Sequence, residues 1–205
     1  MRYIENNSAK FARCMQKLRK VAQQIQDVAP QDEIVLSKLG QAFLSCGDYE
    51  TAEDLFGKAE CFSSSDLQPR VNNALLAIHL SNFVQAREEF ELALSCFKFQ
   101  EEDISLTSPV VGGSLWTSVD VEISIVENLA VASLYTKELH KAVQLLEGLL
   151  VRDPLRYCVP TVIRSLLSLY QFLTGDVQAR RKQLEEICLA FVPEDFDFSV
   201  FQSDT

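Results

Sequence analysis

The side chains that most often carry out catalysis or hold metals are few in this sequence. His79 lies in an apolar stretch that we expect to be helical, and His140, the other histidine, lies in a turn between two expected helices. Each is interpreted as a structural side chain rather than as a metal ligand or general base. The six cysteines, at positions 14, 46, 61, 96, 158 and 188, form no C-x-x-C pair and no other zinc-ligand spacing. These residues therefore predict no metal site.

Motifs that bind nucleotides or cleave peptides are missing as well. The sequence contains no G-x-x-x-x-G-K-S/T loop, no G-x-G-x-x-G and no H-E-x-x-H. Acidic pairs such as Glu88–Glu89 and Glu185–Glu186 are interpreted as solvated faces, and no nucleophile, base and orienting group share a recognisable spacing. We expect the chain to be no enzyme and to use no cofactor, metal or small-molecule substrate.

Charge and composition limit the classes of partner. The net charge of −10 argues against the basic surface that nucleic acids and anionic membranes require. No uncharged apolar run approaches the roughly 18 residues of a membrane span, and the opening MRYIENNSAK has no apolar secretion signal. Most cysteines fall at apolar positions of helical patterns, where a reduced thiol acts as a small hydrophobe. We therefore expect a cytoplasmic protein without direct membrane insertion.

A repeated pattern organises the elements that carry these side chains. Ala52, Phe56 and Ala59 recur as Ala86, Phe90 and Ala93, at a constant interval that equals the tetratricopeptide period. The residues before them extend the pattern: Leu39, Gly40, Phe43, Gly47 and Tyr49. The whole resembles the tetratricopeptide signature L-G-x-x-Y followed by A-x-x-x-F-x-x-A, with Phe43 at the first aromatic position. The pattern predicts an all-α fold, a right-handed tetratricopeptide superhelix of antiparallel helix pairs.

Proline spacing extends this register in both directions. The signature closes with a proline twelve residues after the first small residue, and Pro154 follows Ala142 at that distance. One period before Ala52 the same rule predicts Pro30, although Ser64 and Lys98 occupy the two intervening slots. We therefore predict one solenoid over 1–205 that begins in mid-repeat. Its parts are a half-repeat helix at 10–28, repeats at 33–66, 67–100 and 123–156, a degenerate repeat at 157–190, and a tail at 191–205 that packs over the last helices.

Residues 101–122 interrupt the period. The interval from Ala86 to Ala142 exceeds one period by the length of this segment, which contains Pro109, Gly112 and Gly113. One interpretation is a disordered loop, which is cheap because loop closure costs only about 0.6 kcal/mol per doubling of length. The other is a segment that docks Leu115 and Trp116 onto the solenoid or a partner.

The first helix of each pair is expected to line a concave groove. Its expected lining is mainly apolar and comprises Ile34, Gln41, Leu44, Val71, Asn72, Leu75, Ile78, Val131, Leu134 and Tyr135. Any of these side chains could instead belong to the core. Groove lysines and arginines that would hold a C-terminal carboxylate are missing, so no carboxylate clamp is expected. An apolar segment, from a partner or from this chain, fits the lining better.

Three longer stretches carry a more specific pattern. They are GDYETAEDLFGKAE, NFVQAREEFELAL, and the run ENLAVASLYTKELHKAVQLLEGLLVRDPLRYCVPTVIRSLLSLYQF followed by ARRKQLEEI. The run keeps Asn128, Leu134–Tyr135, Asp153–Pro154, Tyr157 and Leu166–Tyr170. Together they cover most of residues 33–190 and resemble the C-terminal region of subunit 12 of the TRAPP (trafficking protein particle) complex. The insertion at 101–122 is longer than expected for that family, and the family's large N-terminal half has no counterpart here.

This resemblance implies a non-catalytic subunit of a vesicle-tethering complex. The complex acts as an exchange factor for a Rab GTPase in transport from the endoplasmic reticulum (ER) to the Golgi apparatus and in autophagy, and its exchange chemistry belongs to other subunits. The implied partners are those subunits, and the implied location is cytoplasmic, peripheral to ER exit sites and the Golgi. The alternative is a free-standing tetratricopeptide adaptor that binds peptides or chaperones.

Overall fold

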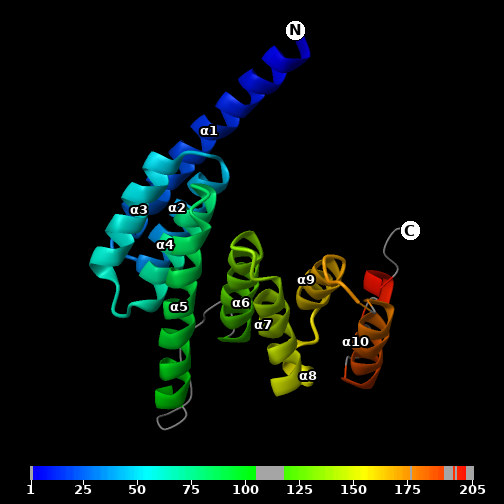
Figure 1. Cartoon of the computed structure of the whole chain (residues 1–205). Coiled ribbons are helices and arrows are strands. Elements are labelled where there is room, and N and C mark those ends of the chain that lie inside the picture. The colour runs from blue at the N-terminus through cyan, green and yellow to red at the C-terminus, as the bar shows by residue number, and fades with distance from the viewer. Residues whose placement is uncertain (1, 105–117, 176, 192–195, 197, 202–205) are drawn as a thin grey trace. The chain divides into compact units, whose positions relative to one another are not determined.

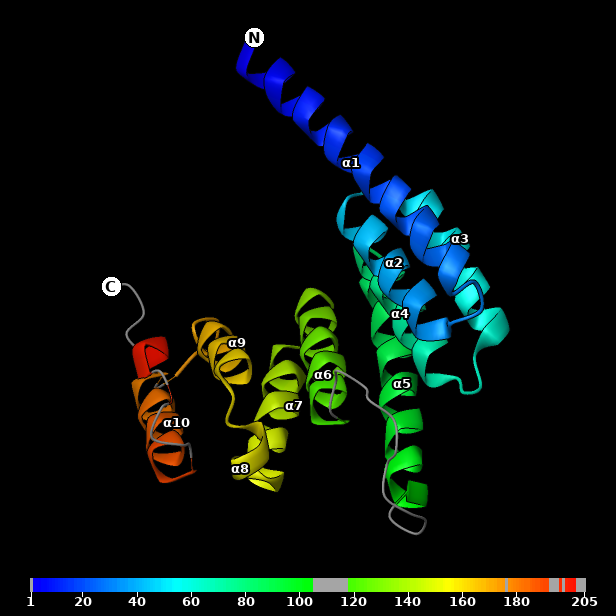
Figure 2. The same ribbon diagram turned by 180° about the vertical axis from the view of Figure 1, so that it is seen from behind.

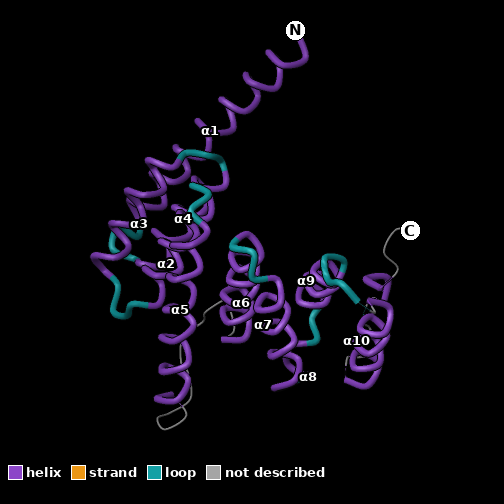
Figure 3. Tube along the Cα trace, viewed as in Figure 1, coloured by secondary structure: helices purple, strands orange, loops and turns teal. Residues whose placement is uncertain are grey.

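The chain folds into helices. The computed structural model describes residues 2–104, 118–175, 177–191, 196 and 198–201, and every regular element among them is helical (Figures 1 and 3). The helices pack in adjacent pairs, so the predicted all-α class is confirmed for this part of the chain. The chain divides into two compact units, Met1–Ser81 and Asn82–Thr205, which are described separately.

The first unit contains α1 (Arg2–Val28), α2 (Glu33–Ser45), α3 (Tyr49–Phe62) and α4 (Leu67–His79). α2 packs against α3, and α4 contacts both of them. Aspartate side chains define where two of the helices begin. Asp32 accepts a hydrogen bond from the Val35 N–H at 3.0 Å, and Asp48 accepts one from the Thr51 N–H at 3.4 Å. Such caps satisfy amide groups that have no partner inside the helix.

The expected half-repeat helix at 10–28 lies within the longer helix α1. Its C-terminal part contacts α2, where Ala22 is buried and Met15 and Leu18 pack against the core of the unit. Its N-terminal part extends past the other helices of this unit (Figure 2). Arg19 donates a hydrogen bond of 2.8 Å to Asp48, which lowers the pKa of that carboxyl group. Several apolar side chains of α1 stay exposed: Phe11, Val21, Ile25 and Val28.

Gly40 of α2 lies directly against α3. A Cβ atom added there would lie 2.4 Å from the ring of Phe56, which is nearer than any real Cβ contact. The aromatic ring of α3 therefore occupies the place of the missing side chain on α2. Ala52 and Ala59 are buried on the facing side of α3. Small residues at these positions allow the two helix axes to lie close together.

The second unit contains the remaining helices. They are α5 (Phe83–Ile104), α6 (Ser118–Tyr135), α7 (Leu139–Arg152), α8 (Pro154–Tyr157), α9 (Pro160–Tyr170), α10 (Val177–Phe191) and the 3₁₀ turn η1 (Phe198–Phe201). α6 packs against α5 on one side and α7 on the other, and α7 contacts α8 and α9. Both ends of the expected insertion at 101–122 are thus helical, while Leu115 and Trp116 lie outside the described residues.

The predicted register recurs in the burial pattern. Ala52, Ala86 and Ala142 are each 0% exposed. Four residues further along, Phe56, Phe90 and Leu146 are buried, and so are the residues seven positions along: Ala59, Ala93 and Leu149. Residues separated by the repeat period, or by the longer interval that spans the insertion, therefore occupy equivalent positions in α3, α5 and α7.

The turns that precede these helices share one backbone feature. Gly47, Ser81 and Lys137 all have positive φ, at 80°, 60° and 68°. Each lies the same number of residues before a buried alanine, namely Ala52, Ala86 and Ala142 respectively. After α2, the Gly47 N–H bonds to the Leu44 carbonyl and the Asp48 N–H bonds to the Phe43 carbonyl. After α6, the Lys137 N–H bonds to the Leu134 carbonyl and the Glu138 N–H to the Ser133 carbonyl. This is the Schellman ending of a helix, which needs a left-handed residue.

The described part of the C-terminal tail packs as expected. Val200 and Phe201 of η1 are buried in the core of the second unit, and Phe196 and Phe198 pack against it. η1 contacts α9. Phe196, Phe198 and Phe201 thus pack over the last helices of the unit.

Replacing Gly40 by alanine should lower the free energy of unfolding by up to about 2 kcal/mol. The added methyl group collides with the buried Phe56 ring, and overpacking of this kind costs about 1–3 kcal/mol, more than the roughly 1 kcal/mol gained in helix propensity. Gly57→Ala and Gly148→Ala are matched controls, because nothing lies within 4 Å of a Cβ at either position. Both should raise stability in urea unfolding followed by circular dichroism. A stabilised Gly40→Ala variant would contradict the close approach.

Exchanging residues at the left-handed turn positions should have opposite effects. Lys137→Gly should raise the free energy of unfolding by about 0.5–1 kcal/mol, because glycine adopts positive φ without a steric cost. Gly47→Ala should lower it by about 1 kcal/mol for the converse reason. Lys137→Ala, which keeps the strain, should be close to neutral in the same assay. A Lys137→Gly variant no more stable than Lys137→Ala would refute this explanation.

Candidate protein-interaction groove

The expected groove residues of the first unit differ in their exposure. On α2, Ile34 is 59% exposed and Gln41 is half-buried, but Leu44 is buried in the core. Leu44 is only 2% exposed, so it presents no surface to a partner. On α4, three expected residues are half-buried, namely Val71, Leu75 and Ile78.

Asn72, the fourth expected residue on α4, holds α2 and α4 together. Its Nδ2 donates to Ser37 Oγ at 2.9 Å, and its Oδ1 accepts from Gln68 Nε2 at 3.0 Å and from Gln41 Nε2 at 3.5 Å. Both Asn72 and Ser37 are buried. Because these bonds already use both ends of its amide group, Asn72 stabilises the unit instead of facing a ligand.

An open groove lies in the second unit, between α6 and α9. It encloses about 430 Å³, with Leu146 of α7 among the residues around it. Val131 and Leu134, which the sequence assigns to a groove, are part of the lining, and Val131 is 41% exposed. Phe172, which follows α9, adds an aromatic ring that is 62% exposed. The structure therefore brings two of the expected residues together with an aromatic residue that the sequence analysis did not single out.

Tyr135 does not line this groove. Its ring stacks on Phe83 of α5, with centroids 4.1 Å apart and planes 7° from parallel, and the residue is 62% exposed. This stacked pair joins the start of α5 to the end of α6.

The groove carries a carboxylate in a partly apolar setting. Glu127 of α6 accepts a hydrogen bond from Ser165 Oγ of α9 at 3.2 Å. Burial disfavours its charged form and raises the pKa of Glu127, an effect that the Ser165 hydrogen bond reduces. Its neighbour Asn128 donates to the Ser124 carbonyl of its own helix at 2.8 Å. Arg164 of α9 also lines the groove and is exposed.

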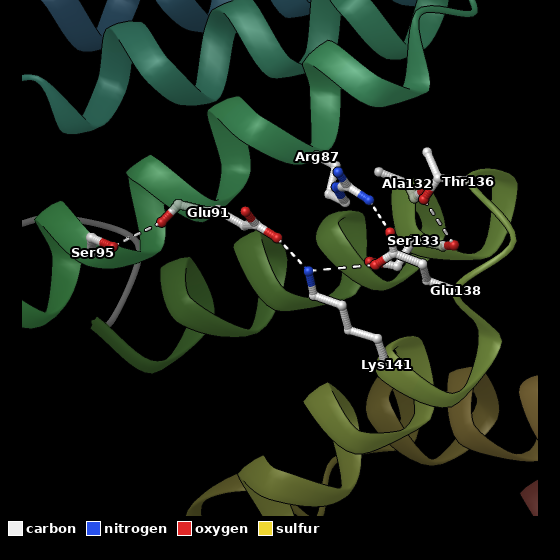
Figure 4. Close-up of polar contacts among 8 residues, drawn as sticks. All are labelled: Arg87, Glu91, Ser95, Ala132, Ser133, Thr136, Glu138 and Lys141. Atoms are coloured by element: carbon white, nitrogen blue, oxygen red, sulfur yellow. Dashed lines mark hydrogen bonds and ion pairs between the residues drawn. The ribbon is translucent and has the colours of Figure 1, made fainter.

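Ion pairs fix α5 against the α6–α7 turn. Arg87 bonds to Glu138, and Lys141 lies 2.5 Å from Glu91 and 3.5 Å from Glu138 (Figure 4). The hydrogen bond to Glu91 is the main reason that the pKa of Lys141 is raised. The pairs are half-exposed, so each contributes only modestly to stability. Their effect is to orient the helices that carry the α6 side of the groove.

A buried carboxylate anchors the start of α6. Glu122 is 1% exposed and accepts hydrogen bonds from Tyr157 Oη at 2.5 Å and from Arg152 Nη2 at 2.6 Å. Burial, followed by the hydrogen bond to Glu122, raises the pKa of Tyr157. The sequence analysis placed Glu122 at the end of an insertion and missed this interaction. The relation between Glu122 and Tyr157, which lie on different helices, is visible in the sequence only once both helices are known.

The two histidines lie near helix ends. His79 ends α4, where its Nδ1 lies 3.0 Å from the Leu75 carbonyl oxygen. His140 lies in the first turn of α7 and is exposed, so its expected place in the preceding turn was wrong. Within the described ranges, no three His, Cys, Asp or Glu side chains gather where they could hold a metal ion, and no helix is long and apolar enough to cross a membrane.

The cysteines follow the expected core role only in part. Cys158 and Cys188 are buried in the second unit, whereas Cys46 and Cys96 are half-buried. Cys14 and Cys61 are exposed.

Comparison with models of protein families gives no match, and comparison with curated protein sequences gives none either.

Removing the Tyr157 hydroxyl should lower the free energy of unfolding by about 1.5–3 kcal/mol. Tyr157→Phe keeps the ring packed but leaves the buried Glu122 carboxylate with one hydrogen bond fewer, and bonds to charged groups contribute about this much. Tyr135→Phe is the matched control, because Tyr135 is exposed and its ring stacking is retained. Thermal and urea unfolding measure both variants. Equal stabilities of the two would show that the Tyr157–Glu122 bond contributes nothing.

Proposed function

We propose that this chain is a non-catalytic tetratricopeptide-repeat scaffold that binds other proteins. The observation that carries the proposal is the left-handed turn residue at Gly47, Ser81 and Lys137, recurring with the same spacing as the buried alanines. A helix-turn-helix unit repeated in register is the building block of tetratricopeptide superhelices, whose surfaces bind proteins. The groove between α6 and α9 supplies an apolar surface of the kind that such scaffolds offer.

We further propose that the scaffold is a subunit of a vesicle-tethering complex of the TRAPP type. Support comes from the sequence run with the most specific resemblance, whose marker residues have structural roles in the second unit. Asp153 caps α8, Tyr157 bonds to the buried Glu122, and Tyr170 is buried with its hydroxyl group 2.8 Å from Glu147. On this proposal the protein acts in ER-to-Golgi transport and autophagy, peripheral to ER exit sites and the Golgi, and leaves the Rab exchange chemistry to other subunits.

Affinity purification tests the two proposals together. With the full chain as bait in cells, other subunits of the tethering complex should be recovered. Val131→Glu, which places a charge in the groove, should reduce their recovery several-fold if the groove makes a subunit contact. Val151→Glu is the matched control, since Val151 is 82% exposed on α7 and lies outside that groove. Recovery of chaperones alone would contradict the tether and favour the free-standing adaptor.

A further inference from the structure

Glu127 differs from the other acidic side chains that are shielded from water in the second unit. Glu122 pairs with Arg152, Glu138 with Arg87, and Glu147 with Arg180. Among the residues that the structure describes, no cation pairs with Glu127, whose hydrogen-bond partner is the neutral hydroxyl of Ser165. The carboxylate therefore loses water without gaining an ion pair, and its raised pKa reflects that loss.

The position of Glu127 links this unpaired charge to the groove. It lines the same hollow as the exposed Val131 and Phe172, so a protein segment that covers these apolar side chains also covers the carboxylate. A wholly apolar segment would bury the charge further and be disfavoured. Arg164 also lines the groove, but it is exposed and forms no ion pair with Glu127 in the described structure.

We propose that the α6–α9 groove binds a segment of a partner protein in which a lysine or arginine lies beside apolar residues. The cation pairs with Glu127, and the apolar neighbours contact Val131, Leu134 and Phe172. This inference rests on the proposed scaffold function and specifies the chemistry of its partner. It is opposite in charge to a site that binds a C-terminal carboxylate, because the partly buried charge that it pairs with is negative.

The sequence of this chain favours a separate partner over an internal segment. The residues outside the described ranges, chiefly 105–117 and 192–205 without Phe196 and 198–201, contain no lysine or arginine. Those segments could supply apolar side chains to the groove but not the cation. The overall charge of −10 also favours association with a segment that carries positive charge.

Selection from a random-peptide library displayed on phage tests the proposal with the full chain as target. Peptides selected on the unmodified protein should be enriched in lysine or arginine flanked by apolar residues. Selection on Glu127→Gln should lose the enrichment in cations and keep the apolar residues. For a synthetic copy of a selected peptide, replacing its cation by norleucine should weaken binding about tenfold to the unmodified protein and hardly at all to Glu127→Gln, since close charge pairs contribute about 1.5 kcal/mol or more.

Two controls separate the charge effect from misfolding. Glu127→Gln should be at least as stable as the unmodified chain at neutral pH, because its amide removes the cost of keeping a partly buried carboxylate ionised. Glu53→Gln makes the same change of charge at an exposed position of α3 outside the groove and should keep the preference for cationic peptides.

Several results would overturn the proposal. They are an absence of selected peptides, an equal yield of acidic ones, or an unchanged preference on Glu127→Gln. Self-association of the chain that Glu127→Gln abolishes in sedimentation would instead place a second copy in the groove. Recovery of tether subunits that is insensitive to Glu127→Gln would leave the scaffold function standing and refute only this contact.

Discussion

The close approach of paired helices is the constraint on which the rest of the structure depends. At Gly40 there is no room for even a methyl group beside Phe56, and Ala52, Ala86 and Ala142 are wholly buried at equivalent positions. Two helices this close bury each other on one side only. Each therefore needs a further helix on its other apolar side, as α6 has with α5 and α7. The stacking of helix pairs follows from the size of a few side chains.

The sequence predicted this framework because its signals are local. The spacing of Ala52, Phe56 and Ala59 lies within two turns of one helix, and its recurrence marks the equivalent helices without reference to any distant contact. The start of α6 was not predicted, for a physical reason. That helix is buried on several sides, with Ile123, Ile125, Val126 and Leu129 all in the core, so its sequence shows no single apolar stripe. Glu122 was consequently assigned to an insertion.

The candidate site was predictable only in outline. An apolar residue on the first helix of a pair can face the groove or the neighbouring helix, and the sequence periodicity is the same in both cases. Leu44 and Val131 show the two outcomes, one buried and the other 41% exposed. Polar contacts were harder to predict from the sequence than the position of apolar residues. Asn72 bonds to Ser37 on a different helix, and whether an asparagine faces a ligand or braces two helices depends on that distant partner.

The distribution of charge in the second unit bears on specificity. Glu122, Glu138 and Glu147 each have a basic partner, and the buried Glu122 has a tyrosine hydroxyl as well. Such pairing satisfies the charge within the chain and leaves nothing for a ligand to complete. An apolar groove alone discriminates poorly between partners, because contact area sets neither affinity nor selectivity. A carboxylate that is partly desolvated and unpaired changes this: segments without a cation are penalised, and those with one gain a pair in a setting that water screens weakly. On this proposal, the groove is selective because the fold gives the Glu127 carboxylate no cationic partner of its own.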